Sequence, residues 1–255
     1  MTIDFLKSIV GFFLKWLAKI YLWRVKPYVV VVAGTTGRYW IKEAISEAFL
    51  EKGITTRSNQ KNFNAEIGLP LSVLGLGSGE KNFWKWIKIL CQALKIALLN
   101  TNYKLLNTSY LVLEMAIDKP QNMDYLLSIV RPNSSVFTTI TMVYRENFES
   151  LDEISLEYQR LIKSLPPDGL AILNFDDERV KNLFSFSPCA TVSYGLGEGA
   201  DFRAEEIKKV TDGQTFRVSN LRLKINRFGT HHIYAALVKE IIKEKMPISA
   251  NLSKF

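Results

Sequence analysis

The chain has 255 residues, of which 47% are hydrophobic and 12% aromatic, and a formal net charge of +8. This length holds one large domain or two small ones with a full core. Half of the net charge lies in residues 1–28, where five basic residues accompany one acid, so a general nucleic-acid surface, which spreads its charge more widely, is excluded. Cys91 and Cys189 lack a paired spacing, and we expect two reduced, buried thiols in a cytosolic protein.

Residues 5–23 form the first predicted element, an amphipathic helix. Lysines interrupt every apolar run well short of the roughly 18 residues of a membrane span, and no secretory cleavage site follows. One arc of the helix is apolar and aromatic: Ile9, Phe12, Phe13, Trp16, Leu17, Ile20 and Trp23. Lys7, Lys15 and Lys19 lie opposite. Two interpretations stay open: the arc lies in an anionic membrane interface, or it packs on its own domain or on a second copy.

After Pro27 the sequence alternates short apolar strands with helices, which predicts an α/β fold of three layers around a mostly parallel sheet. The predicted strands are 28–33, 110–115, 135–141, 169–175 and 190–195. The predicted helices are 39–52, 82–98, 121–130, 150–164 and 230–243. Residues 216–220 and 221–228 predict a small antiparallel hairpin. No linker-like composition divides this part, so we expect residues 28–255 to form one domain behind the helix of residues 1–27.

The first strand runs into Gly34, Thr35, Thr36 and Gly37, and a helix follows. Backbone N–H groups at such a strand–loop–helix junction form an anion site that resembles a phosphate-binding loop. A working nucleotide loop also needs a lysine on the β- and γ-phosphates and a hydroxyl on Mg²⁺. The chain has Arg38 and Tyr39 there instead. By itself the pattern is weak, and a tight turn without ligand stays an alternative.

Two later motifs strengthen the case: N-x-N-x-E-I-G-x-P over residues 62–70, and N-x-D-D over residues 174–177 after a strand. Their order and context resemble the central domain of the Mur ligases, nearest to the branch that adds D-alanyl-D-alanine to the UDP-muramoyl tripeptide. The resemblance runs from about Pro27 to the end of the sequence. It implies an amide-ligase fold that holds ATP and Mg²⁺, between a UDP-substrate domain and an amino-acid domain, for which we expect no room here.

The resemblance also assigns roles to individual residues. It implies a nucleotide site formed by Gly34, Thr35, Thr36, Gly37, Arg38, Tyr39, Asn174 and Asp177. It places Asn62 and Asn64 at the substrate end and makes Glu114, at the end of a strand, a ligand of Mg²⁺. Gly229 and His231 match a G-x-H motif, and a start of the last helix explains them better than a metal site.

Four departures fall on the chemistry that the resemblance implies. Arg38 stands for the loop lysine, Tyr39 for a metal-binding threonine, Tyr144 for a metal-binding histidine and Tyr158 for a carbamylated lysine. Loss of one group that stabilises transferred charge commonly costs about 2.7–4 kcal/mol. We therefore expect a catalytically impaired protein that binds nucleotide weakly, whose status as an enzyme is open and in which retention of ATP and Mg²⁺ is doubtful.

Two other functions stay open at this point. One is an active ATP-dependent ligase whose remaining domains come from other chains, with Arg38 serving for lysine. The other is a scaffold at the membrane surface that associates with cell-wall synthesis proteins. For each of them we expect a cytoplasmic chain, peripheral on the inner face of the membrane where residues 5–23 attach it.

Overall fold

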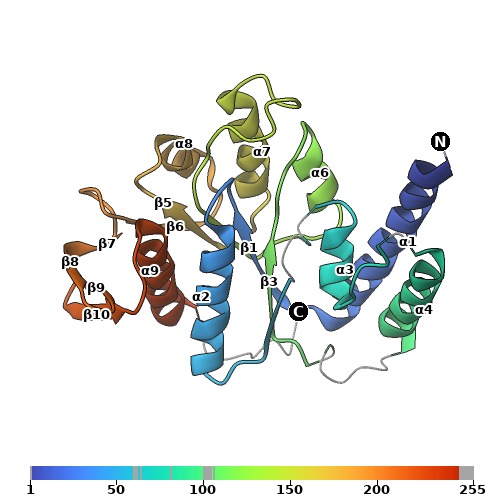
Figure 1. Cartoon of the computed structure of the whole chain (residues 1–255), viewed down its shortest axis with the longest axis horizontal. Helices are drawn as coiled ribbons and strands as arrows, with labels where there is room; N and C mark the ends of the chain where they lie inside the picture. Colours follow the sequence, from blue (N-terminus) through green and yellow to red (C-terminus); the bar gives the residue numbers. More distant parts are fainter. Residues whose placement is uncertain are drawn as a thin grey trace.

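The computed structural model describes residues 2–59, 63, 65–80, 82–99, 105 and 107–246, with side chains from residue 9 onward. Seven strands form one parallel sheet with helices on both faces (Figure 1), which confirms the predicted three-layer α/β class. The strands of this sheet are β1 (Tyr28–Ala33), β2 (Thr56–Ser58), β3 (Tyr110–Glu114), β4 (Ser134–Phe137), β5 (Leu170–Asn174), β6 (Ala190–Gly195) and β7 (Phe202–Arg203).

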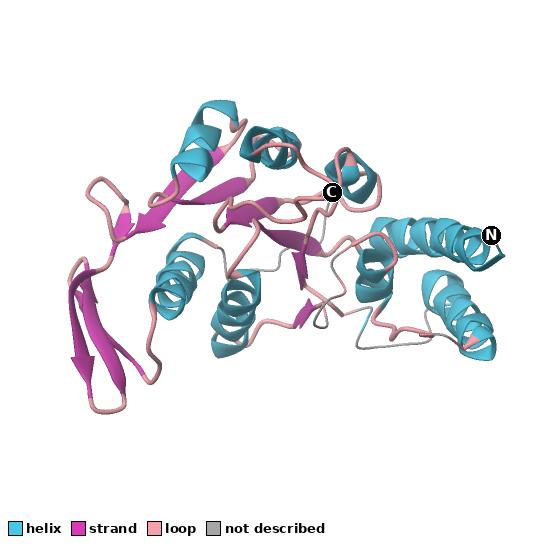
Figure 2. Ribbon diagram, turned by 45° about the horizontal axis from the view of Figure 1, so that its top comes forward, coloured by secondary structure: helices cyan, strands magenta, loops and turns pink. Residues whose placement is uncertain are grey.

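Helices cover the two faces of the sheet unequally (Figure 2). One face is covered by α2 (Arg38–Glu51) and α9 (Thr230–Lys245). The other is covered by α1 (Thr2–Val25), α3 (Gly68–Leu74), α4 (Phe83–Leu99), α6 (Asn122–Leu127) and α7 (Leu151–Lys163). The short helices α8 (Glu178–Asn182) and η1 (Leu183–Phe186) follow β5. Buried apolar strands with helices on both sides are what the continuous valine and leucine runs predict.

The strand order is β2-β3-β1-β4-β5-β6-β7, so β1 lies between β3 and β4. The register pairs Val32 with Glu114 and Ala33 with Phe137. The carboxyl ends of β1, β3, β4 and β5 therefore meet at one edge of the sheet. In open α/β sheets this edge is where ligands bind.

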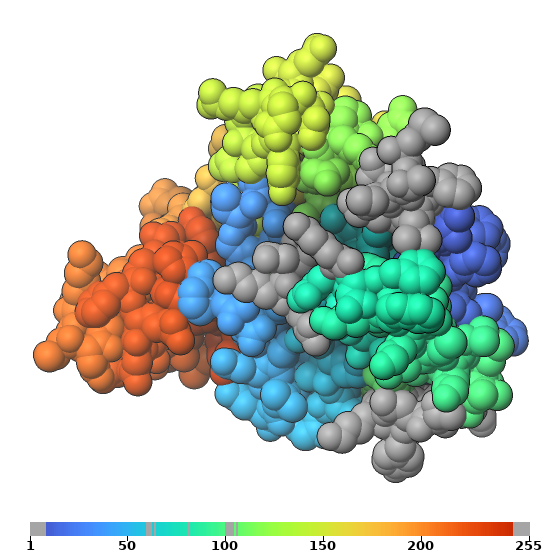
Figure 3. Space-filling model, turned by 45° about the vertical axis from the view of Figure 1, so that its right-hand side comes forward, coloured from blue at the N-terminus to red at the C-terminus, as the bar shows by residue number. Residues whose placement is uncertain are grey.

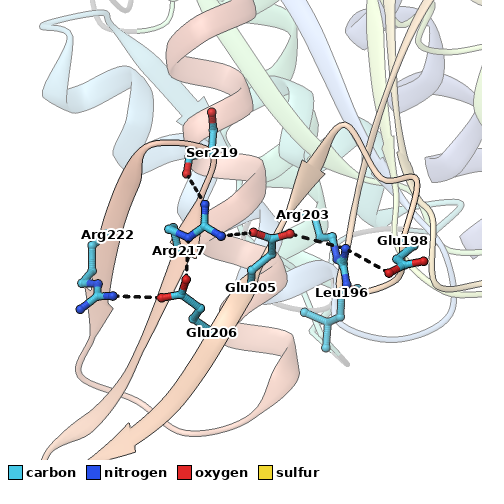
Figure 4. Close-up of polar contacts among 8 residues, drawn as sticks. All are labelled: Leu196, Glu198, Arg203, Glu205, Glu206, Arg217, Ser219 and Arg222. Atoms are coloured by element: carbon cyan, nitrogen blue, oxygen red, sulfur yellow. Dashed lines mark hydrogen bonds and ion pairs between the residues drawn. The ribbon is translucent and has the colours of Figure 1, made fainter.

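A second, antiparallel sheet of β8 (Glu205–Val210), β9 (Gly213–Val218) and β10 (Leu221–Ile225) extends from the main one. It confirms the predicted hairpin and adds β8 to it. Arg217 connects its strands by donating to Glu205 at 2.6 Å and to Glu206 at 3.0 Å (Figure 4). These side chains are partly exposed, so each pair contributes at most about 1 kcal/mol.

The predicted strands and helices all exist; the bounds of 28–33 and 190–195 are those predicted, and the other ends shift by at most four residues. Capping explains one boundary: the Ser150 hydroxyl accepts from Glu153 N at 3.3 Å, and the Glu153 carboxylate accepts from Glu149 N at 2.8 Å, which starts α7. The prediction of two buried cysteines is wrong, because Cys91 is exposed on α4 and Cys189 is half-buried.

Candidate functional site

The loop between β1 and α2 is built on two left-handed glycines. Gly34 has φ of 123° and Gly37 has φ of 79°. A Cβ on Gly34 would come within 2.1 Å of the Thr138 hydroxyl and 3.0 Å of the Thr139 carbonyl. Glycine is therefore required at 34 by close contact with the segment after β4. Gly37 meets no such neighbour and is required by its backbone angle where α2 begins.

Threonines join this loop to the segment after β4. Thr35 N donates to Thr139 O at 2.7 Å. The hydroxyls of Thr36 and Thr139 lie 2.5 Å apart, and Thr141 N donates to the Thr35 hydroxyl at 2.9 Å. The Thr35 N–H, which the sequence assigned to an anion site, is thus already engaged by the protein. The predicted anion site therefore loses this backbone donor, and Thr36, Gly37 and the first turn of α2 remain as its candidate groups.

Arg38 and Lys42 turn from α2 toward Glu114 at the end of β3. Lys42 Nζ lies 3.2 Å from Glu114 Oε1, and Arg38 Nε lies 3.7 Å from Glu114 Oε2. Lys42 also donates to Asn59 O at 2.9 Å, and Arg38 donates to Gly34 O. Lys42 and Glu114 are 2% and 6% exposed, so their charges are held in a medium where attraction is strong. The carboxylate that the resemblance assigned to Mg²⁺ is neutralised by cations of the chain itself.

The three tyrosines of the altered positions lie in different surroundings. Tyr158 is buried beside Arg38, and burial raises the pKa of its hydroxyl. That hydroxyl approaches the Gly34 backbone without meeting hydrogen-bond geometry. Tyr144 is exposed, and its φ of 51° forms a turn. Tyr39 is exposed above α2, with Lys42 Nζ 5.2 Å from its ring centroid. None of the three offers a carboxylate or an imidazole to a metal.

A pocket of about 310 Å³ opens beside the loop, between the first turns of α2 and α9. The ends of β4, β5 and β6 form its floor, and aromatic side chains form much of its wall. Its lining residues are Thr36, Gly37, Trp40, Ile41, Thr138, Thr139, Asn174, Tyr194, His231 and Tyr234. A concave site with mainly apolar walls and a few polar groups is the usual form of a small-molecule site.

Asn174 supplies the most specific polar group of this pocket. It is 1% exposed, and its Oδ1 accepts from Asp176 N at 3.1 Å, which fixes the orientation of the amide. Its Nδ2 has no hydrogen-bond partner. Burial of an unpaired donor is costly. Asn174 lines the pocket, but this donor atom is enclosed by the protein, so a ligand reaches it only if the side chain turns.

Other polar groups near the pocket act on the framework. Asp177 Oδ1 accepts from Val180 N at 3.0 Å and caps α8, and its Oδ2 accepts from Ile140 N at 3.0 Å. Asp176 accepts from Leu196 N at 2.7 Å and from the Tyr234 hydroxyl at 2.7 Å. Asp177 does not line the pocket, so its place favours a positioning role over nucleotide contact.

The structure brings Thr36, Gly37 and Asn174 of the proposed nucleotide residues to the pocket. Gly34 and Thr35 form the loop behind it, and Arg38 turns away toward Glu114. Asn62 and Asn64 lie outside the described residues. The sequence-based assignment missed seven of the ten lining residues: Trp40, Ile41, Thr138, Thr139, Tyr194, His231 and Tyr234. Two of these residues could have been found from the sequence. Tyr194 lies near the end of a predicted strand, and Tyr234 lies one turn after His231 of the G-x-H motif.

The Mur ligase middle domain family matches residues 91–239. The chain belongs to this family. The D-alanyl-D-alanine-adding ligase of Bacillus subtilis is 26% identical over 226 residues, which cover 88% of this chain and 42% of that protein. The corresponding ligase of Haemophilus influenzae is 20% identical over 230 residues, covering 88% of this chain and 43% of the other. The chain thus spans less than half the length of these relatives.

Solved structures show the same fold. MurF from Acinetobacter baumannii superposes with a TM-score of 0.70 at 19% identity, covering 89% of this chain and 45% of that one. MurF ligase from Thermotoga maritima, solved in complex with ADP, has a TM-score of 0.70 at 20% identity and covers 90% and 48%. The recognised family and the expected architecture are confirmed, and the central sheet is a Mur ligase framework.

Proposed function

We propose that this chain binds an adenine nucleotide mainly through its base and does not carry out the metal-assisted phosphoryl transfer that the Mur ligase family implies. The observation that carries the proposal is the pairing of Glu114 with Lys42 and Arg38 at 3.2 and 3.7 Å. A carboxylate already neutralised by two cations gains little from Mg²⁺, and placing a divalent ion beside those cations costs repulsion.

The residues present fit one end of ATP and not the other. The pocket is lined by the Asn174 amide and by the rings of Trp40 and Tyr194. These groups suit a flat heterocycle that accepts a hydrogen bond. At the phosphate end, Arg38 donates to Gly34 O, Thr35 N is bound by Thr139, and Tyr158 lies buried where the family pattern has a metal-side group.

Without a metal ion, the described residues of the pocket can bind and orient a nucleotide base. They supply no group that would assist phosphoryl transfer. Trp40 lies against His232, with ring centroids 4.4 Å apart, and this contact fixes one wall of the pocket. The Tyr194 hydroxyl donates to Phe137 O at 3.0 Å and holds the floor. Phosphoryl transfer needs charge stabilisation at the transferred group, and Arg38 and Lys42 are committed to Glu114.

A titration with a graded set of ligands tests the proposal. Adenosine, AMP, ADP and ATP should bind the chain with affinities within about tenfold of one another, because the base supplies most of the contact. Inorganic tripolyphosphate is the matched probe for the phosphate end and should bind far more weakly than adenosine. An affinity that rises steeply with each phosphate, together with tight tripolyphosphate binding, would support the rival function, an active ligase completed by other chains.

A further inference from the structure

Helix α1 packs on the domain with one face and leaves another uncovered. Leu14, Ala18 and Tyr21 are buried in the core beneath the sheet. The Tyr21 hydroxyl donates to Leu105 O at 2.6 Å and accepts from Arg57 at 3.0 Å. Of the arc that the sequence singled out, Leu17 belongs to this buried face and Ile20 is half-buried against it. The alternative of a helix packed on its own domain therefore holds for α1, while the aromatic side chains of the arc are not part of that packing.

The aromatic side chains of this arc lie on the surface. Trp23 is 74% exposed and Phe12 is 59% exposed. Trp16 joins Phe12 in an edge-on ring contact at 6.3 Å, and Lys19 Nζ lies 4.8 Å from the Trp16 ring centroid. From residue 9 onward, where its side chains are described, α1 exposes the large apolar residues Ile9, Phe12, Phe13, Trp16 and Trp23. A contiguous apolar area of this kind on a folded domain marks an interaction site.

Helix α4 repeats the arrangement. Ile89, Ala93 and Ala97 are buried along one stripe. Its exposed apolar residues are Phe83, Trp84, Ile87, Leu94, Leu98 and Leu99, and Trp84 is 71% exposed. The sequence predicts a helix over residues 82–98, and the first turn of that helix leaves Phe83 and Trp84 exposed.

The two exposed faces form one surface. α1 and α4 lie side by side (Figures 2 and 3). Arg24 near the end of α1 donates to Ala97 O near the end of α4, so the helices run in the same direction. With 100° per residue and the buried stripes turned inward, the two exposed apolar arcs fall on the same side of the pair. We call this surface, formed by the exposed apolar residues of α1 and α4, the α1–α4 face.

Basic residues border the α1–α4 face at both outer edges. On α1, Lys15 and Lys19 lie beside the exposed apolar residues. On α4, Lys88 and Lys95 lie beside them in the same way. Helix α1 has four basic residues and one acid, and α4 has three basic residues and no acid, so the pair carries +6 of the chain's +8. Aromatic side chains with flanking lysines are the composition of helices that lie in a lipid headgroup region.

We propose that the α1–α4 face binds the surface of an anionic bilayer, with its aromatic side chains in the interface and its lysines against lipid phosphates. Within the described residues, no helix is long and apolar enough to cross a membrane, so the attachment is parallel to the surface. Each lysine near an anionic leaflet contributes up to about 1 kcal/mol. A second copy of the chain is a poorer occupant, because it would place another +6 against the first without an acid to pair.

Cosedimentation with vesicles tests this face in the intact chain. The probes are vesicles of equal parts phosphatidylglycerol and phosphatidylcholine, and vesicles of phosphatidylcholine alone. The test variant is Phe12→Ser, Trp16→Ser and Trp84→Ser, whose side chains are 59%, 48% and 71% exposed and whose replacement leaves the core intact. The matched control is Leu156→Ser, Leu221→Ser and Phe228→Ser, which removes similarly exposed apolar side chains elsewhere (53%, 56% and 50%).

The wild-type chain and the control should bind the anionic vesicles at low salt, and the test variant should bind at least tenfold more weakly. Binding should fall as salt rises and should be much weaker to phosphatidylcholine. Lys15→Glu, Lys88→Glu and Lys95→Glu together should reproduce the loss while the thermal melt stays unchanged. Absence of binding to anionic vesicles, or equal loss in the control, would overturn the proposal. So would a stable dimer of the wild-type chain, seen by light scattering, that the test variant abolishes.

Discussion

Lys42 Nζ lies 3.2 Å from Glu114 Oε1 in the interior of the protein, and both side chains are almost fully buried. Arg38 adds a second cation on the other carboxylate oxygen at 3.7 Å. Buried charges persist in a fold only when they are paired. The Arg38–Glu114–Lys42 group is therefore a complete ionic cluster, and it lies where the Mur ligase pattern would bring phosphate and metal together.

Glu114→Gln should lower the free energy of unfolding by about 3 kcal/mol, because it leaves Lys42 buried without its main counter-charge. Urea denaturation measures the effect. Glu43→Gln is the matched control: Glu43 Oε1 lies 3.4 Å from the same Lys42 Nζ but is 44% exposed, so its loss should cost less than about 1 kcal/mol. Equal or greater stability of Glu114→Gln would show a carboxylate that awaits an external cation, as in a metal site.

Asn174→Ala should weaken ATP binding about five- to tenfold, since it removes the amide side chain that lines the pocket. Calorimetry measures this change. Asp177→Ala tests the neighbouring position that the sequence also assigned to nucleotide. It should instead lower stability by about 1 kcal/mol through loss of the α8 cap, with ATP affinity unchanged. An affinity loss in Asp177→Ala as large as that in Asn174→Ala would restore Asp177 to the binding site.

The stability of the fold should decrease as pH falls from about 7.5 to 5.5. Desolvation, with the charges of His231 and Arg227, lowers the pKa of His232 below 6.5. The unfolded chain then binds the proton more readily than the folded chain, so the stability present above the unfolded pKa is lost on acidification. His232→Phe keeps a ring against Trp40 and should flatten this part of the pH profile. An unchanged slope, or an NMR titration placing the His232 pKa above 6.5, would contradict the assignment.

The sequence predicted the central sheet well because its information there is local. Val29 to Val32 form a buried run that only an internal strand accommodates, and the parallel order follows from the alternation with helices. The strand β2 was missed because Thr56–Ser58 is short and polar and forms only by pairing with β3. The helix α3 was missed because Gly68 and Pro70 resemble a turn.

The site was predicted in part, for a related reason. Gly34 and Gly37 supply backbone angles that the loop motif requires, and Asn174 ends a strand in the N-x-D-D motif. The structure places the two glycines in the loop and Asn174 at the pocket. The inward turn of Arg38 depends on Glu114, which is 76 residues away and becomes a neighbour only through the parallel pairing of β1 with β3. The docked face of α1 was missed because that helix is apolar on nearly every side, so composition alone does not choose the side that packs.

Calorimetric titration of the chain with ATP, in the presence of Mg²⁺ and in the presence of EDTA, tests the central claim most directly. The account predicts weak binding with nearly the same affinity in both conditions, because the base pocket is formed and Glu114 is already held by Arg38 and Lys42. Tight binding that EDTA abolishes would contradict it and would indicate a metal-dependent ligase site.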